Sequence, residues 1–292
     1  FYNMQKIALL TCDRFPELYE TDQKLIPVLK EYGYMAKAEI WDNPNVNWHQ
    51  YDVLIFRNIW DYYLKIGTFN AWLDTIDNFS IRSFNPISVI RWNKHKFYLR
   101  ELQAIGIPVI PGIYISRTNE LNIEKLLPCD WTQAILKPAI SAGSHLTTLF
   151  DTKDAASVSV NYHDIAKEQD LILQKFIPEI CTEGEISLLF FDKKFSHAVV
   201  KKPKAGDFRI QSMFGGKYQA YSPTGSLLKM AQKIVDYIEH DLLYARVDGI
   251  IIDGTFHLME LELIEPDLYF DYVENGTMKF ADNIHKFIRN IN

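Results

Sequence analysis

The chain of 292 residues has only three cysteines, and each stands alone. Cys12, Cys129 and Cys181 lie far apart, with no Cys-x-x-Cys spacing between them. Thiols this few and this scattered argue against a disulfide framework and against a cysteine-based zinc site. They fit a reduced protein, and we therefore expect a cytoplasmic location.

Long apolar runs and an excess of basic residues are also missing. No stretch approaches the ~20 consecutive apolar residues that a membrane helix needs, so we expect no membrane partner. The formal net charge of −6 argues against a nucleic-acid partner, because surfaces that bind nucleic acids usually carry excess Lys and Arg. With 48% hydrophobic and 23% charged residues, the composition is that of a globular protein. The length predicts two or three domains.

Three short apolar runs near the N-terminus predict strands. They are KIALLTCD (6–13), YMAKAEIW (34–41) and YDVLIFRN (51–58), and the pattern between the first two predicts a helix over about 20–32. A strand, a helix and a strand at this spacing indicate a small parallel α/β domain. In such a sheet, polar residues just beyond the strand ends face the ligand crevice.

Four residues at the end of the third run are our candidates for substrate recognition: Arg57, Trp60, Asp61 and Tyr62. An arginine at this place could hold a carboxylate with two hydrogen bonds, while the aromatic rings would wall the pocket. Packing of Trp60 and Tyr62 at a domain interface explains the same residues equally well.

The pattern changes after Asn85-Pro86. We expect a helix from about 94 to 105, an edge strand near Pro108 and Pro111, and then mostly antiparallel strands with a helix over about 227–240. Two hairpins are predicted, with turns at Asp192-Lys193 and at Asp253-Gly254. The fold class is therefore α/β with a large antiparallel part (α+β), divided into an N-terminal domain (1–90), a central subdomain (91–172) and a C-terminal subdomain (173–292).

The stretch LMELELIEPD (258–267) places glutamates in an apolar, alternating segment. The predicted turn sets Asp248 opposite residue 259 or 260, next to Glu260, and Glu262 shares the face of Glu260. Three converging carboxylates repel one another unless a cation neutralises them. Mg²⁺ suits oxygen ligands, with Mn²⁺ as an alternative, so we predict a metal site at these three residues; Glu265 is its least secure neighbour. The alternative is an exposed edge strand with solvated acids.

A metal of this kind usually completes its shell with phosphates. Lys137 ends a predicted strand, and a loop of small residues follows it, namely Ser141, Ala142, Gly143 and Ser144. The backbone N–H groups of such a loop could contact phosphates, with Lys137 as the point charge. A plain β-turn is the alternative, since no Walker motif is present.

Two further segments could contact a nucleotide or its substrate. Gln174, Lys175, Phe176 and Ile177 end a strand and could hydrogen-bond an adenine edge, although an ordinary core strand is the alternative. Lys201 and Arg209 belong to a glycine-containing basic stretch that could bind an anion, or could simply be solvated.

Taken in order, these segments resemble the ATP-grasp superfamily, most closely its glutathione-synthetase-like branch. The resemblance runs from about residue 85 to 266 and rests on NKHKF, ILKPAISAGSH, LQKFIPEICTEGEISLLFF, FRIQSMFGG, RVDGIII and MELELIEP. At the N-terminus, LLTCDRFPELYETD, EIWDNP and FRNIWDYY resemble a narrower group that includes the ATP-grasp enzyme closing the D-cycloserine ring.

The resemblance implies an ATP-grasp fold whose central subdomain is a lid, and it implies roles for particular residues. Lys96 and Lys137 would contact the ATP phosphates under the flexible loop 141–145, and Glu185 would lie near the nucleotide or the substrate. Arg209 would hold the acylphosphate or the substrate carboxylate. Asp248 and Glu260 would bind Mg²⁺, and Glu262 falls where the superfamily commonly has asparagine. Dimers are common in the superfamily, so a homodimer is also implied.

The function that follows is an ATP-dependent carboxylate–amine ligase acting on an amino acid or small peptide through an acylphosphate. Its substrate would be a small molecule with a carboxylate and an amine or another nitrogen nucleophile. Two alternatives stay open: an intramolecular cyclo-ligase of the D-cycloserine type, and a catalytically silent nucleotide-binding regulator.

Overall fold

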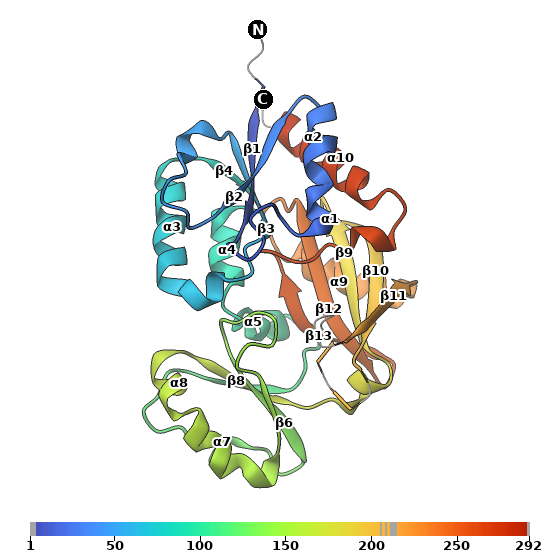
Figure 1. Ribbon diagram of the computed structural model, residues 1–292. Helices are drawn as coiled ribbons and strands as arrows, with labels where there is room; N and C mark the ends of the chain where they lie inside the picture. Colours follow the sequence, from blue (N-terminus) through green and yellow to red (C-terminus); the bar gives the residue numbers. More distant parts are fainter. Residues whose placement is uncertain (1–3, 205, 208, 211–214, 291–292) are drawn as a thin grey trace.

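The computed structural model describes residues 4–204, 206–207, 209–210 and 215–290. Their strands form three sheets, which Figure 1 shows as an N-terminal part, a C-terminal part beside it and a central part at the far end. In these ranges no helix has both the length and the apolar character that crossing a membrane requires.

The N-terminal part is a parallel sheet in the order β2-β1-β3-β4, which confirms the predicted parallel α/β domain. Its elements are β1 (Lys6–Thr11), α1 (Glu20–Gln23), α2 (Leu25–Glu31), β2 (Met35–Ile40), η1 (Trp48–Gln50), β3 (Val53–Asn58), η2 (Tyr62–Lys65), α3 (Ile66–Asn78) and β4 (Arg82–Phe84). The single helix predicted over 20–32 is two short helices, because Pro27 has no N–H to donate to the carbonyl four residues earlier.

Strands β1 and β3 are apolar on both faces because both faces of the sheet are covered. Ile7 and Leu9 share one core with α2 and with α10 (Gly276–Arg289). Ala8 and Leu10 point to the other core, which α3 closes with Phe69, Trp72, Leu73 and Ile76. That spacing along α3 forms one helical stripe. Continuous apolar runs of this kind are typical of buried parallel strands.

The central part is an antiparallel sheet in the order β5-β8-β6-β7 with a core of its own. It contains β5 (Gly112–Ile115), α6 (Ile123–Leu126), β6 (Gln133–Pro138), β7 (Thr148–Asp151), η3 (Thr152–Asp154), α7 (Ala155–Asn161), α8 (His163–Glu168) and β8 (Leu171–Lys175). The predicted edge strand is confirmed as β5. The predicted boundary between 172 and 173 falls inside β8. Because β8 pairs with β6 as far as Lys175, the central part ends after that residue.

The C-terminal part is a five-stranded antiparallel sheet in the order β11-β10-β9-β12-β13. It comprises η4 (Pro178–Cys181), β9 (Glu185–Phe191), β10 (Lys194–Lys202), β11 (Lys217–Tyr221), α9 (Gly225–Asp236), β12 (Tyr244–Ile252), β13 (Thr255–Glu262), η6 (Phe270–Tyr272) and α10. Both predicted hairpin turns are confirmed, and all four turn residues have the positive φ that two-residue hairpin turns require.

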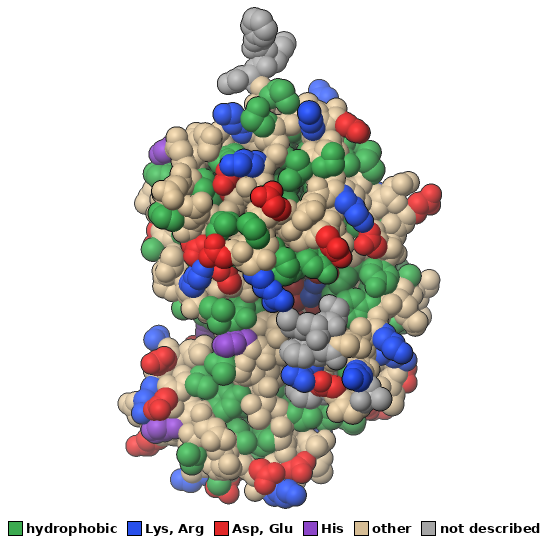
Figure 2. Space-filling model, viewed as in Figure 1, with side chains coloured by type: hydrophobic (Ala, Val, Ile, Leu, Met, Phe, Trp, Pro, Cys, Tyr) green, Lys and Arg blue, Asp and Glu red, His purple; other side chains and the backbone are tan. Residues whose placement is uncertain are grey.

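Two helices join the parts: α4 (Ile87–Asn93) and α5 (Tyr98–Ala104). Residues of α5 belong to the core of the C-terminal sheet, although we assigned them to the central subdomain. The N-terminal sheet also shares a core with β9, β10 and α10. The N-terminal and C-terminal parts therefore form one packed body, and the central part extends from it. In Figure 2, Lys and Arg side chains lie around the waist where the central part begins.

Candidate active site

Two lysines that are far apart in the sequence meet at the loop between β6 and β7. Lys137 lies near the end of β6, and Lys96 lies between α4 and α5. The backbone N–H of Lys96 donates to the carbonyl of Ala139 (2.9 Å), and its ammonium donates to the carbonyl of Ser141 (2.5 Å). These contacts accompany a break in the helix predicted over 94–105. They hold Lys96, which is 5% exposed, against the loop.

The loop 139–147 has a folded backbone. Gly143, Ser144 and Leu146 have φ angles of 59°, 62° and 50°, in the left-handed region. A backbone that turns through left-handed φ angles can point successive N–H groups toward one place. Concave arrangements of N–H groups of this kind bind anions. His145 packs against Tyr63 of the N-terminal part, with ring centroids 5.2 Å apart. The loop therefore lies between Lys96 and the N-terminal part.

The Lys137 ammonium is the least satisfied charge at this loop. Burial lowers the pKa of Lys137; Glu260 opposes this effect and the nearby Lys96 ammonium adds to it. Among the described residues we find no hydrogen bond or salt bridge to the Lys137 ammonium. An anion placed beside it would favour its charged form, so this position is suited to a phosphate.

The acidic hairpin has the predicted register. Asp248 pairs with Glu260, and Arg246 pairs with Glu262 on the neighbouring step. The register shifts between Asp248 and Gly249, where a Cβ atom would come within 2.4 Å of the His257 carbonyl. Glycine is therefore required at this irregularity, which sets the two acids opposite each other.

Cationic side chains, which we did not predict, neutralise these acids. Arg246 donates to both oxygens of Asp248 (2.9–3.1 Å) and to Glu262 (2.5 Å), and Lys96 forms a salt bridge with Glu260 (2.9 Å). Arg246 lies two residues before Asp248 in a strand and so shares its face. The alternation of side chains along the strand RVDGIII (246–252) therefore places Arg246 and Asp248 on one face. We predicted only the aspartate of this motif as a site residue.

A second buried ion pair adjoins the first. Lys201 on β10 bonds Glu185 on β9 at 2.5 Å and lies 3.8 Å from Asp248. Burial raises the pKa of the Glu185 carboxyl, although Lys201 opposes this. Burial would also raise the pKa of Asp248, but Arg246 and Lys201 hold it below its usual range. Lys201, Glu185, Asp248, Arg246 and Glu262 thus form one chain of ion pairs. The Lys96–Glu260 pair and the Lys137 ammonium adjoin it, and we call the whole set the charged cluster.

Comparison with known proteins agrees with this geometry. The model of the ATP-grasp domain of prokaryotic glutathione synthetase matches residues 101–267, which is more than half of the chain. The chain belongs to the ATP-grasp ligase family. The model of the N-terminal domain of the D-cycloserine synthetase DcsG matches residues 7–85.

Individual ATP-grasp relatives cover most of the chain. The cycloserine biosynthesis protein DcsG of Streptomyces lavendulae is 25% identical over 273 residues, covering 88% of this chain and 90% of that protein. The crystal structure of D-cycloserine synthetase DcsG has a TM-score of 0.87 at 23% identity, covering 97% of this chain and 99% of that one. The D-alanine–D-alanine ligase from Bacillus anthracis has a TM-score of 0.67 at 14% identity, covering 98% and 99%. The ATP-grasp fold that we expected is confirmed.

The predicted metal site of this ATP-grasp protein fits Mg²⁺ at two of its three residues. Glu260 and Glu262 are partly exposed carboxylates on the same strand face. Burial and the neighbouring carboxylates raise the pKa of Glu262 well above its usual range, and similar causes raise that of Glu265 to about 8. A carboxyl whose pKa is raised by burial and by neighbouring carboxylates is poorly compensated as an anion, and a divalent cation would favour its charged form.

Asp248 fits the metal site less well, because Arg246, Ser187 and Lys201 surround both of its oxygens. Within the described residues, no group of three or more His, Cys, Asp or Glu side chains is arranged to hold a metal ion. The assignment of Asp248 as a metal ligand therefore stays a prediction.

The predicted adenine segment is largely a core strand. Gln174 is buried in the centre of the sheet, where it pairs with Gly112 and Ile135. The N–H groups of Lys175 and Phe176 donate to the carbonyls of Pro111 and Gln133, so neither is available to an adenine edge.

A hollow of about 610 Å³ beside this segment is lined by Phe176, together with Thr147, Leu149, Cys181 and Arg209. The contact of residues 174–177 with a nucleotide stays a prediction. Because two of their N–H groups are already hydrogen-bonded and Phe176 lines the hollow, such a contact would be made by side chains more than by these N–H groups.

The predicted anion loop is divided by the structure. Lys201 is not on a loop; it is buried in β10, and its ammonium is committed to Glu185, so a direct substrate contact is not supported. Arg209 forms a salt bridge with Asp207 (2.8 Å) near the 610 Å³ hollow. Positions 208 and 211–214 of FRIQSMFGG lie outside the described residues.

The structure corrects two of the four predicted substrate residues. Arg57 is fully buried and donates to Asp22 and to the carbonyl of Pro266, so it holds the fold together and cannot reach a substrate carboxylate. Tyr62 is buried in the core under α3. Arg57 is charged because it joins the N-terminal part to the segment that follows β13.

Of the other two predicted substrate residues, Trp60 lies beside the acidic segment and Asp61 does not contact it. Trp60 donates its indole N–H to the carbonyl of Glu265 (2.9 Å). Asp61 accepts a hydrogen bond from Trp41 and bridges to Lys65. Because Trp60 contacts the end of the acidic segment, it places the mouth of the N-terminal part against the acids.

Proposed function

We propose that this protein is an ATP-dependent carboxylate–amine ligase that acts on an amino acid or small peptide and releases ADP and phosphate. One observation carries the proposal: the Lys137 ammonium is half-buried, has no partner among the described residues and faces a folded loop beside Lys96. This arrangement suits a polyphosphate, and the carboxylates opposite it suit a divalent cation.

The residues divide the work of binding. Lys96 and Lys137 would neutralise the ATP phosphates, while the N–H groups of residues 141–144 would orient them. Glu260 and Glu262 would hold Mg²⁺, which when bound neutralises phosphate charge. Arg246 would keep Asp248 and Glu262 in place. Such chemistry depends on positioning and charge neutralisation more than on a covalent nucleophile of the protein.

The proposed reaction has two balanced steps. The substrate carboxylate attacks the γ-phosphorus of ATP, an acylphosphate forms and ADP leaves. A nitrogen nucleophile then attacks the acyl carbon, a carbon–nitrogen bond forms, and phosphate leaves with loss of a proton from nitrogen. The cations of the cluster stabilise the charge that develops on the transferred phosphoryl group.

A second candidate is intramolecular ring closure, in which carboxylate and nitrogen belong to one molecule. The similarity to DcsG supports this candidate, since it includes the N-terminal domain as well as the ATP-grasp domain. In this family member the N-terminal part contacts the acids through Trp60, so it is placed to choose the substrate. The first step is the same in both candidates.

The test is ADP formation in the presence of Mg²⁺ with pools of amino acids and dipeptides, some of which carry the carboxylate and a second nitrogen nucleophile in one molecule. Mass spectrometry of the products separates the two candidates. A ligation joins two substrates, whereas a cyclisation gives one product that is lighter than its single substrate by one water.

Two variants test the assignment of the cluster. Lys137→Met should lower the rate of ADP formation about 10²–10³-fold. Lys153→Met, on an exposed lysine of the same subdomain, should not change it. ATP binding without turnover on any pool would favour the silent regulator. If ATP does not bind at all, the proposed function is wrong.

A further inference from the structure

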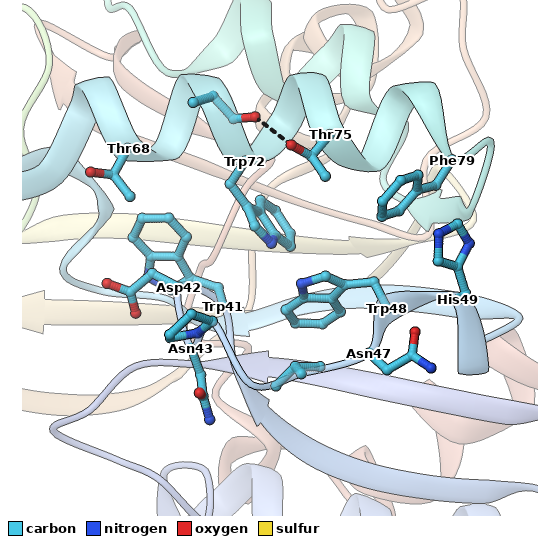
Figure 3. A pocket seen from close by; sticks show the side chains of 13 residues that line it. Trp41, Asp42, Asn43, Asn47, Trp48, His49, Thr68, Trp72, Thr75 and Phe79 are labelled. Atoms are coloured by element: carbon cyan, nitrogen blue, oxygen red, sulfur yellow. Dashed lines mark hydrogen bonds between the residues drawn. The ribbon is translucent and has the colours of Figure 1, made fainter.

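A hollow of about 420 Å³ lies in the N-terminal part, and its lining shares no residue with the charged cluster. Figure 3 shows its two walls: the segment 41–49, which follows β2, and the face of α3 that carries Thr68, Trp72 and Thr75. A hollow of this size is within the range of small-molecule sites.

Three of the six tryptophans line this hollow. Trp72 extends from α3 toward Trp41 and Trp48, and its ring centroid lies 5.9 Å and 5.5 Å from theirs, with steep angles between the planes. At the far end, His49 lies against Phe79. Rings set at steep angles offer both faces and edges, which suits a flat apolar molecule.

The indole N–H of Trp72 carries the inference. The side chain is 8% exposed, and its nitrogen is the one buried side-chain polar atom without a hydrogen-bond partner in the described part of the chain. Figure 3 shows this nitrogen at the end of the ring that faces Trp48, across the hollow from α3. The indole N–H of a buried tryptophan usually donates to an acceptor, because a buried donor without a hydrogen bond costs free energy.

The polar side chains that line the hollow indicate whether its ligand is charged. Asp42 is the one carboxylate of the lining, and Lys65 neutralises it at 2.7 Å. Apart from His49, the remaining polar side chains of the lining are uncharged amides and hydroxyls, among them Asn43 and Asn47. An ion would gain no opposite charge here and would lose its hydration.

We propose that this hollow binds a small, uncharged, planar ring compound whose carbonyl oxygen or ring nitrogen accepts the Trp72 N–H. The Trp72 nitrogen is closed off from solvent, and the Trp48 ring packs against the Trp72 ring with centroids 5.5 Å apart, so the ligand would reach the N–H by displacing the edge of Trp48. The site lies outside the proposed ligase reaction, and its occupant is not a substrate of that reaction.

Two ring compounds of similar size test the proposal on the full chain. Benzamide carries a carbonyl acceptor, and toluene does not. We expect saturation-transfer NMR and quenching of tryptophan fluorescence to show benzamide binding with a dissociation constant of about 1 mM, as suits so small a ligand. Toluene should bind about tenfold more weakly, which is the effect of one buried hydrogen bond.

Two variants locate the binding. Trp72→Phe keeps an aromatic ring at this position, smaller than the indole, and removes the N–H, so it should erase the difference between the two compounds. Ala71→Phe, on the exposed side of α3, should fill the hollow and abolish both signals without disturbing the core. Trp131→Phe, in the separate core of the central part, is the matched control and should change neither.

Three outcomes would overturn the proposal: equal binding of benzamide and toluene, no binding of benzamide, or unchanged discrimination in Trp72→Phe. Each would mean that the face of the Trp48 ring already satisfies the Trp72 N–H. The hollow would then be a surface groove only.

Discussion

Replacing Arg246 with methionine should destabilise the protein more than the loss of an ordinary salt bridge. The guanidinium donates to both oxygens of Asp248, to Glu262 and to the carbonyl of Asp267, and all of its carboxylate contacts lie between 2.5 and 3.1 Å. In the variant, Asp248 keeps only Ser187 and the more distant Lys201, at 3.8 Å.

The magnitude follows from burial. Asp248 is 2% exposed, so the variant leaves a buried carboxylate without its main partner. Breaking such a pair on one side costs about 3–5 kcal/mol, which is a large part of the 5–15 kcal/mol by which a domain is typically stable. Removing both charges, in Arg246→Met with Asp248→Asn, should recover most of this loss, because the buried Asp248 charge is then gone and only the partly exposed Glu262 has lost its partner.

Urea unfolding followed by circular dichroism, with EDTA present, measures these free energies. The matched control is Arg91→Met, which breaks a more exposed salt bridge with Asp74 and should cost less than about 1 kcal/mol. The reasoning would be refuted if Arg246→Met were as stable as the control, or if the double variant were no more stable than the single one. In either case Arg246 would not be the cation that neutralises the acids.

Three further predictions test other parts of the molecule. Lys137→Met should lower the rate of ADP formation about 10²–10³-fold with little change in the unfolding midpoint, since it removes one charge aimed at the phosphates; wild-type turnover in this variant would contradict the phosphate assignment. Tyr63→Leu should raise KM for ATP about two- to tenfold, because the loop 139–147 loses the ring contact with His145, whereas Tyr63→Phe should not; equal kinetics in the two variants would argue against a role for the contact. Burial lowers the pKa of His197 to about 4, so below a pH of about 6.5 the unfolded chain binds the extra proton and the folded chain does not. The stability due to the neutral His197 is present above about pH 6.5 and declines by up to about 3 kcal/mol as the pH falls toward 4. In urea unfolding measured at several pH values, His197→Gln should flatten this decline in the free energy of unfolding. An unchanged slope in the variant would show that His197 is not responsible.

The sequence by itself determined the local structure of this protein. Alternating and continuous apolar runs placed the strands, and the positive-φ residues at Asp253-Gly254 fixed the pairing from Ile252–Thr255 to Gly249–Leu258. The irregularity between Asp248 and Gly249 then shifts Asp248 opposite Glu260, one residue beyond the register of the turn. These features depend on neighbours in the chain, so periodicity and turn chemistry are enough to predict them. The ATP-grasp resemblance likewise depended on short motifs in order.

Only the tertiary structure decided which charges meet and which side chains reach solvent. Lys96 meets Glu260 and the loop at Ser141, and Arg57 is buried against Asp22, because packing brings together segments that are distant in the chain. Arg246 turned the predicted open acid cluster into an ion-paired one. A strand pattern tells which face a side chain is on, but the partner on that face and the water that is excluded from it are properties of the packed protein.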